Sequence, residues 1–251
     1  MLDAALAGAA ALVAAAFALT ALDRWHRRGT PHDHAFAVSM TLFAVGALAL
    51  WWAAAVGWSL PTFRVFFLAG AVLSVAWLAL GNVYLVAGHR AGHRLRAWLL
   101  AASAFAAGVV AVAPARRAIG EGEFPAAREL FGVLPRALAA VGSGVPALFI
   151  VGAAMWSATR AMRGRAPALS GVARTAVAPS RLAIGNSLVA VGTLVLSASG
   201  SLAGRLGKER AFAVTLVAGV VVLFAGYLVA VSRPAATRSP RPGSPASATR
   251  G

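Results

Sequence analysis

The stretch VFFLAGAVLSVAWLALGNVYLVAG, residues 65–88, decides the fold class. It contains no charged residue, and its amide side chain, Asn82, lies close to its end. A helix that crosses a bilayer needs about 20 predominantly apolar residues, because hydrocarbon offers the backbone no hydrogen-bond partner. This stretch is therefore long enough and apolar enough to span a membrane as one helix.

Further segments of the same kind lie on both sides of this stretch. The chain has 251 residues, of which 60% are hydrophobic and 12% charged, whereas a soluble domain has about 45–50% and about 25%. We predict an all-α fold: residues 1–231 form one polytopic membrane bundle of seven transmembrane helices. The predicted spans are approximately residues 4–22, 35–58, 65–88, 97–113, 137–158, 182–203 and 211–231.

The distribution of basic residues between the loops predicts the orientation. Loops on one side of the bundle, together with the tail, receive 15 Arg and Lys residues, and those on the other side receive 8. Because the richer side of a multi-pass protein faces the cytoplasm, we expect the N-terminus outside and the C-terminus inside a bacterial plasma membrane. Residues 232–251 are rich in Ser, Pro and Arg without apolar periodicity, which predicts a disordered basic cytoplasmic tail.

The net charge of +16 also bears on the partners. In a soluble protein such a charge would indicate nucleic acid, but here the arginines occupy short gaps between apolar stretches rather than one basic face. We therefore expect no nucleic acid as a partner. The expected partners are the lipid bilayer and the anionic lipids at its cytoplasmic face, near which the tail arginines gain electrostatic energy.

Two asparagines occur in nearly the same context, Leu-Ala-Leu-Gly-Asn82 and Leu-Ala-Ile-Gly-Asn186. Given the predicted topology, both amides lie in the cytoplasmic third of the membrane. The sequence predicts an interhelical hydrogen bond between spans three and six, or alternatively a substrate or ion path that these amides line. The tyrosines, Tyr84 and Tyr227, both begin a Tyr-Leu-Val-Ala sequence at the cytoplasmic end of a span, and we assign them to the same polar group.

The histidines also fall on the predicted cytoplasmic side. His32 and His34 flank the carboxylate of Asp33, and His89 and His93 are one helical turn apart if the third helix extends that far. Imidazole and carboxylate groups are ligands for transition metals, so these four histidines form a candidate metal site. The alternative is that histidines, like arginines, are tolerated in inner loops without binding anything.

Several kinds of chemistry have no residues to support them. The chain has no Cys, which excludes disulfides, thiol catalysis and Cys-ligated iron–sulfur clusters. Span seven lacks the lysine that a retinal Schiff base needs, and the histidines lie in loops or at span ends, where membrane haem is not normally ligated. We therefore expect no cofactor.

The stretches FLAGAVLSVAWLALGNVYLVAG (67–88) and RLAIGNSLVAVGTLVLSASG (181–200) resemble seven-helix integral membrane proteins of GC-rich bacteria whose function is unknown. The resemblance implies the fold and brings no activity. Because no catalytic motif is recognisable, the sequence favours a non-enzymatic sensor or scaffold. One alternative is a small-solute transporter with an inward-facing site near Asn82 and Asn186, and another is a metal-dependent membrane enzyme that uses the histidines.

Overall fold

The computed structural model describes residues 2–120, 124–162, 184–185, 187–196 and 209–231. These residues form helices and contain no strand, which confirms the predicted all-α class. In chain order the elements are α1 (Leu2–Arg28), α2 (Pro31–Val56), α3 (Leu60–Phe66), η1 (Phe67–Leu73), α4 (Ser74–Val86), α5 (His89–Val112), α6 (Ala127–Leu130), α7 (Val133–Ala139), η2 (Ala140–Gly144), α8 (Val145–Met162), the helix Ser187–Leu196 and α10 (Glu209–Val231).

Five helices are long and apolar enough to cross a membrane, as a multi-pass membrane protein requires. They are Ala4–Arg28, Pro31–Val56, Leu60–Val86, His89–Val112 and Val133–Trp156. Each has between 24 and 27 residues, and about 20 residues suffice for a bilayer core. The first five predicted spans each fall on one of these helices.

The last two predicted spans correspond to shorter apolar helices among the described residues. Ser187–Leu196 lies within the predicted span 182–203, whose other positions lie mostly outside the described residues. The predicted span 211–231 falls on α10, of which Val214–Val229 counts as apolar helix. The seven-span topology stays a prediction, and the predicted tail, residues 232–251, lies outside the described residues.

Two of the long helices contain a π-helical segment. Leu60–Val86 passes through η1, and Val133–Trp156 passes through η2. A Cβ added to Gly142 of η2 would lie 2.6 Å from the Val72 carbonyl oxygen of η1, so the two π-helical segments pack backbone against backbone. A π-helical turn disturbs the regular hydrogen bonding, and near each segment a serine hydroxyl binds a carbonyl four residues earlier: Ser74 binds Gly70 at 2.6 Å, and Ser143 binds Ala139 at 2.7 Å.

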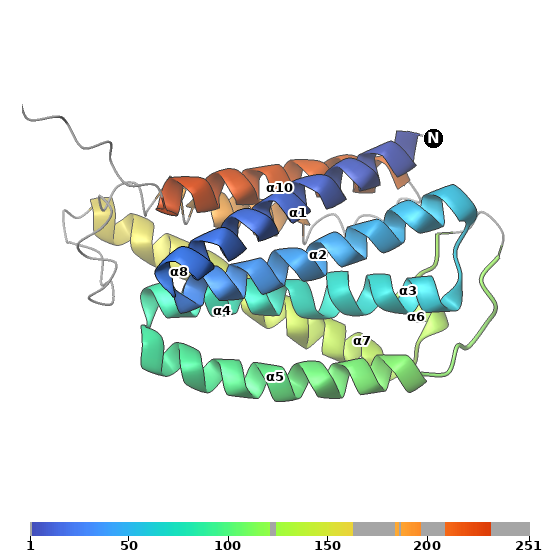
Figure 1. Cartoon of the computed structure of the whole chain (residues 1–251). Helices are drawn as coiled ribbons and strands as arrows, with labels where there is room; N and C mark the ends of the chain where they lie inside the picture. Colours follow the sequence, from blue (N-terminus) through green and yellow to red (C-terminus); the bar gives the residue numbers. More distant parts are fainter. Residues whose placement is uncertain (1, 121–123, 163–183, 186, 197–208, 232–251) are drawn as a thin grey trace, which may run out of the picture.

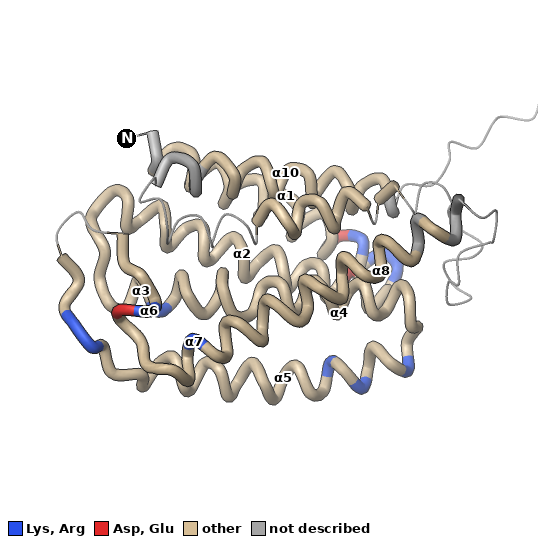
Figure 2. Tube along the Cα trace, turned by 180° about the vertical axis from the view of Figure 1, so that it is seen from behind, with Lys and Arg blue, Asp and Glu red and all other residues tan. Residues whose placement is uncertain are grey.

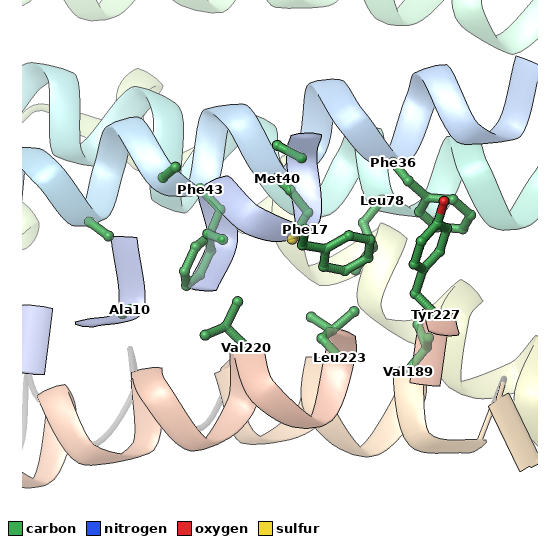
Figure 3. Packing of buried hydrophobic residues seen from close by; sticks show 14 of the residues in the cluster. Ala10, Phe17, Phe36, Met40, Phe43, Leu78, Val189, Val220, Leu223 and Tyr227 are labelled. Atoms are coloured by element: carbon green, nitrogen blue, oxygen red, sulfur yellow. The ribbon is translucent and has the colours of Figure 1, made fainter. Parts of the chain in front are cut away.

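The helices pack in a row that begins with α1 and α10 (Figure 1). Helix α1 lies against α2 and α10, α2 lies against the continuous α3–η1–α4 helix, and α4 contacts α5 and α8. The core between α1, α2 and α10 contains Phe17, Met40 and Leu223, all at most 2% exposed (Figure 3). Helix α1 buries mainly alanines, and such small residues let neighbouring helices approach closely.

The loop positions predicted for the arginine-rich end require a correction. The predicted spans 65–88 and 97–113 leave residues 89–96, with Arg90, Arg94 and Arg96, as a loop, but α5 already begins at His89 and contains all three arginines in its first turns. The connection between α4 and α5 is therefore only a tight turn at Ala87 and Gly88, where Gly88 adopts φ +87°. Arginine and alanine are good helix formers, and an arginine at a helix end can extend its charge to the interface.

Candidate functional site: a buried carboxylate that joins three helices

Asp33 is a charged side chain at 0% exposure, in the first turn of α2. Its position follows from the tight connection between α1 and α2. Gly29 adopts φ +65°, and its N–H binds the Trp25 carbonyl at 2.7 Å, which ends α1. Thr30 is extended and Pro31 starts α2, where its fixed φ and missing N–H are tolerated. A carboxylate in the first turn that follows is favoured by the helix dipole.

Four side chains surround the Asp33 carboxylate. The Tyr227 hydroxyl donates to Oδ1 at 2.8 Å, and the Thr30 hydroxyl donates to Oδ2. The Arg24 Nε lies 3.6 Å from Oδ1, and the His32 Nε2 lies 3.7 Å from the same atom. A buried carboxylate is stable only when charge and hydrogen bonds compensate its lost hydration. We call Arg24, Thr30, His32, Asp33 and Tyr227 the carboxylate clamp.

The clamp connects the last described helix to the first helical hairpin. Arg24 belongs to α1, Asp33 to α2 and Tyr227 to α10. The Arg24 guanidinium carbon also lies 5.8 Å from the centroid of the Tyr227 ring, within the range of a cation–π interaction. Asp33 and Tyr227 are 194 positions apart in the chain, so the clamp fixes the end of α10 against a distant part of the sequence.

Apolar packing holds the Tyr227 ring in place. Its centroid lies 4.6 Å from that of Phe17 and 5.4 Å from that of Phe36, and the tyrosine is 2% exposed. Figure 3 shows the ring among these side chains with its hydroxyl oxygen directed away from the α10 backbone. Because the aromatic contacts position the ring, the hydroxyl reaches the carboxylate without the freedom to turn away.

The second tyrosine makes a separate polar contact at the same end. The Tyr84 hydroxyl lies 3.3 Å from the Nδ1 of His93, and its ring packs edge-on against the His89 ring at 6.3 Å. A Cβ at Gly92 would come within 2.2 Å of the Tyr84 ring, so the ring occupies the space that this glycine leaves. Arg96 interacts electrostatically with both the Tyr84 hydroxyl and His34. The hydroxyls of the two tyrosines thus make two different contacts.

Of the two asparagines that the sequence pairs, the structure describes Asn82. Asn82 is 3% exposed, and its amide nitrogen donates to the Leu78 carbonyl of its own helix at 3.1 Å. Asn186 lies outside the described residues, so the predicted pair with Asn82, as a structural bond or as a substrate path, stays a prediction.

The histidines of the candidate metal site go to different surroundings. His32 faces Asp33, the His34 ring packs against Trp25 at 4.8 Å, and the His89 and His93 rings lie 6.2 Å apart beside Tyr84. Within the described part of the chain, no three His, Asp or Glu side chains are arranged to hold a metal ion. The structure therefore gives the metal hypothesis no geometric support.

Sequence reasoning noted Asp33 only as the residue between two histidines. It missed Arg24, Thr30 and the contact with Tyr227. One signal was available: Asp33 stands at the start of an apolar helix on the arginine-rich side, directly after Thr30 and Pro31. A lone carboxylate in that position needs a cation and hydroxyl donors. The partner on α10 had no local signal, because only the fold brings it there.

Comparison with known proteins adds no further assignment. No protein-family model matches the sequence, and neither the curated proteins nor the solved structures include one with significant similarity.

Proposed function

We propose that this chain is a multi-pass protein of a bacterial plasma membrane that acts without catalysis, as a sensor or scaffold, through its cytoplasmic face. Its N-terminus lies outside and its C-terminus inside, as the 15 basic residues on one side and 8 on the other favour. In this arrangement the clamp lies at the cytoplasmic end of the bundle, and the basic tail continues from α10 on that same side.

The observation that carries this proposal is the buried bond between Tyr227 and Asp33. It ties the helix that precedes the tail to the α1–α2 hairpin at one defined position. A buried polar cluster can favour a single helix arrangement, and a change of that cluster would move α10 and the tail together. A signal inside the bundle would thereby reach a partner at the cytoplasmic surface.

The first experiment tests the membrane orientation. Because the chain has no Cys, single-cysteine variants can be labelled in cells with a membrane-impermeant maleimide. We expect Gly120→Cys to react in intact cells and Ser244→Cys to react only after permeabilisation. Labelling of Ser244→Cys in intact cells, or recovery of the chain in the soluble fraction without detergent, would contradict the proposal.

The second experiment tests the clamp. Tyr227→Phe removes one hydroxyl and keeps the ring, so we expect faster amide hydrogen exchange in the last turns of α10 while the other long helices are unaffected. Tyr84→Phe is the matched control, because it removes a hydroxyl that contacts His93 at the same end. Equal exchange of α10 in both variants and in the wild type would show that the clamp does not hold this helix.

A third measurement tests whether the buried carboxylate forms a proton path. The full chain is reconstituted in liposomes that contain a pH-sensitive dye, and a pH gradient is applied. We expect no proton leak above that of empty liposomes. A leak in the wild type that Asp33→Asn abolishes would assign the buried carboxylate to a proton path and overturn the sensor or scaffold proposal.

A further inference from the structure

Arginines from two helices, α1 and α5, gather at the end of the bundle that contains the clamp. Figure 2 shows the arginines of α5 and those near the α1–α2 connection at one end of the molecule. Both carboxylates at this end are already engaged, since Asp33 belongs to the clamp and Asp23 accepts from the Arg27 Nε at 2.9 Å. The positive charge of the α5 side chains is therefore not balanced by the described acidic residues.

The first turns of α5 concentrate this charge. His89, Arg90, His93 and Arg94 are all exposed, and the first turn contains no acidic residue. Arg90 and Arg94 are four residues apart on the helix, where like charges repel each other. Cations near a helix N-terminus are also opposed by the helix dipole. An anion between the two arginines would relieve both effects.

The surface next to these cations is apolar. Further along α5, Trp98 is 77% exposed, Leu100 49% and Phe105 58%. In a membrane-spanning helix such side chains contact lipid, and an exposed tryptophan marks the level of the interface. In a membrane the two arginines, which precede Trp98 by one and two turns of the same helix, would lie at the depth of the lipid headgroups. An anion that carries acyl chains fits this surface better than a soluble one.

We propose that the first two turns of α5 bind the phosphate of an anionic phospholipid headgroup, with Arg90 and Arg94 as its charge partners and Trp98 beside its glycerol region. The proposal deepens the one above by naming a lipid partner, and it rests on the chain being a membrane protein. It does not depend on how the clamp works.

The test uses the purified full chain in a neutral detergent, with phosphatidylglycerol or phosphatidylcholine added in mixed micelles. Bound lipid is counted by native mass spectrometry, and thermal unfolding is followed in parallel. We expect phosphatidylglycerol to bind and to raise the Tm, and phosphatidylcholine to do neither. Since each arginine near an anionic surface contributes roughly fivefold in affinity, Arg90→Gln/Arg94→Gln is expected to weaken phosphatidylglycerol binding by about 30-fold.

Arg116→Gln/Arg136→Gln is the matched control, because it removes two exposed arginines that lie elsewhere, one beyond the C-terminal end of α5 and one in α7. It should bind phosphatidylglycerol like the wild type. Without lipid, Arg90→Gln/Arg94→Gln should unfold at the wild-type Tm or above it, because a repulsive pair is removed. If this double variant fails to fold, Arg94→Gln alone is measured and should weaken binding about fivefold.

Three outcomes would overturn the proposal. The first is equal binding of the two lipids, and the second is an equal loss in the double variant and its matched control. The third is a Tm increase with millimolar inorganic phosphate as large as that with phosphatidylglycerol, which would indicate a site for a soluble anion. The exchange experiment on the clamp does not vary the anionic lipid, so the clamp proposal and the lipid proposal can fail separately, whereas recovery of the chain in the soluble fraction would contradict both.

Discussion

Gly46 of α2 lies directly against the backbone of Gly70 in η1, and the contact is one-sided. A Cβ at Gly46 would come within 3.1 Å of the Gly70 amide nitrogen and 3.2 Å of its Cα, whereas a Cβ at Gly70 would meet no heavy atom within 4 Å. The atoms that Gly46 faces are backbone atoms, which cannot rotate away. The absence of a side chain at Gly46 therefore sets the distance between α2 and the π-helical segment.

This asymmetry predicts different results for two similar substitutions. Gly46→Ala should push α2 away from η1 and lower the free energy of unfolding by about 1–3 kcal/mol, the usual cost of overpacking. Gly70→Ala should be neutral or slightly stabilising, because alanine is the better helix former. Reversible unfolding in mixed micelles with an added denaturing detergent measures both. Equal destabilisation by the two variants would contradict this interpretation of the contact.

A second pair of glycines tests the packing of Tyr84. A Cβ at Gly92 would overlap the ring of Tyr84, which is itself 2% exposed and cannot move freely. We expect Gly92→Ala to displace the ring, to break its contact with His93 and to cost about 1–3 kcal/mol.

Gly108 provides the control on the same helix, since a Cβ there meets nothing within 4 Å. Gly108→Ala should leave the protein as stable as the wild type or increase its stability by up to about 1 kcal/mol. Near-ultraviolet circular dichroism, which reports tyrosine and tryptophan packing, should change for Gly92→Ala alone. A wild-type spectrum for that variant would show that Tyr84 is not held by this glycine.

The fold class could be predicted from the sequence because the solvent argument needs only composition and length. A stretch such as residues 65–88 has no other way to satisfy its backbone in hydrocarbon. The limits of the helices were harder to predict. The expected loop around Arg90 and Arg94 is helical. The predicted boundary followed the drop in hydropathy at the arginines, but arginine is a good helix former, so the helix begins before the apolar stretch.

The site was less predictable than the fold, for a physical reason. Asp33 and Tyr227 are far apart in the sequence, and neither shows in its own neighbourhood which partner it needs. The sequence grouped Tyr227 with Tyr84 because both begin Tyr-Leu-Val-Ala, but the structure gives one hydroxyl a carboxylate and the other an imidazole. The two similar sequences place Tyr84 and Tyr227 at the same end of the bundle, but they do not give the two tyrosines a common contact.

The negative charge of Asp33 stabilises the fold through its contact with Arg24, and a substitution can test this. Asp33→Asn keeps the size of the side chain and leaves an oxygen that can accept from Tyr227, but it removes the negative charge that lies 3.6 Å from the Arg24 Nε. Breaking a buried ion pair costs about 3–5 kcal/mol. The Arg24 side chain is 19% exposed, so water can hydrate the guanidinium when the carboxylate charge is removed. We therefore expect a smaller loss, about 1–3 kcal/mol in the free energy of unfolding.

Asp23→Asn is the matched control for this prediction. It removes the same charge near the end of the preceding helix, α1, but the Asp23–Arg27 pair is exposed, with side-chain exposures of 56% and 76%. An exposed pair at this spacing contributes at most about 0.5 kcal/mol, so the variant should unfold like the wild type. If Asp23→Asn were as destabilising as Asp33→Asn, the loss would reflect the overall charge of this end and not the clamp. The double variant Asp33→Asn/Tyr227→Phe tests whether the two groups interact directly. If they do, its loss in the free energy of unfolding should be smaller than the sum of the losses of the two single variants.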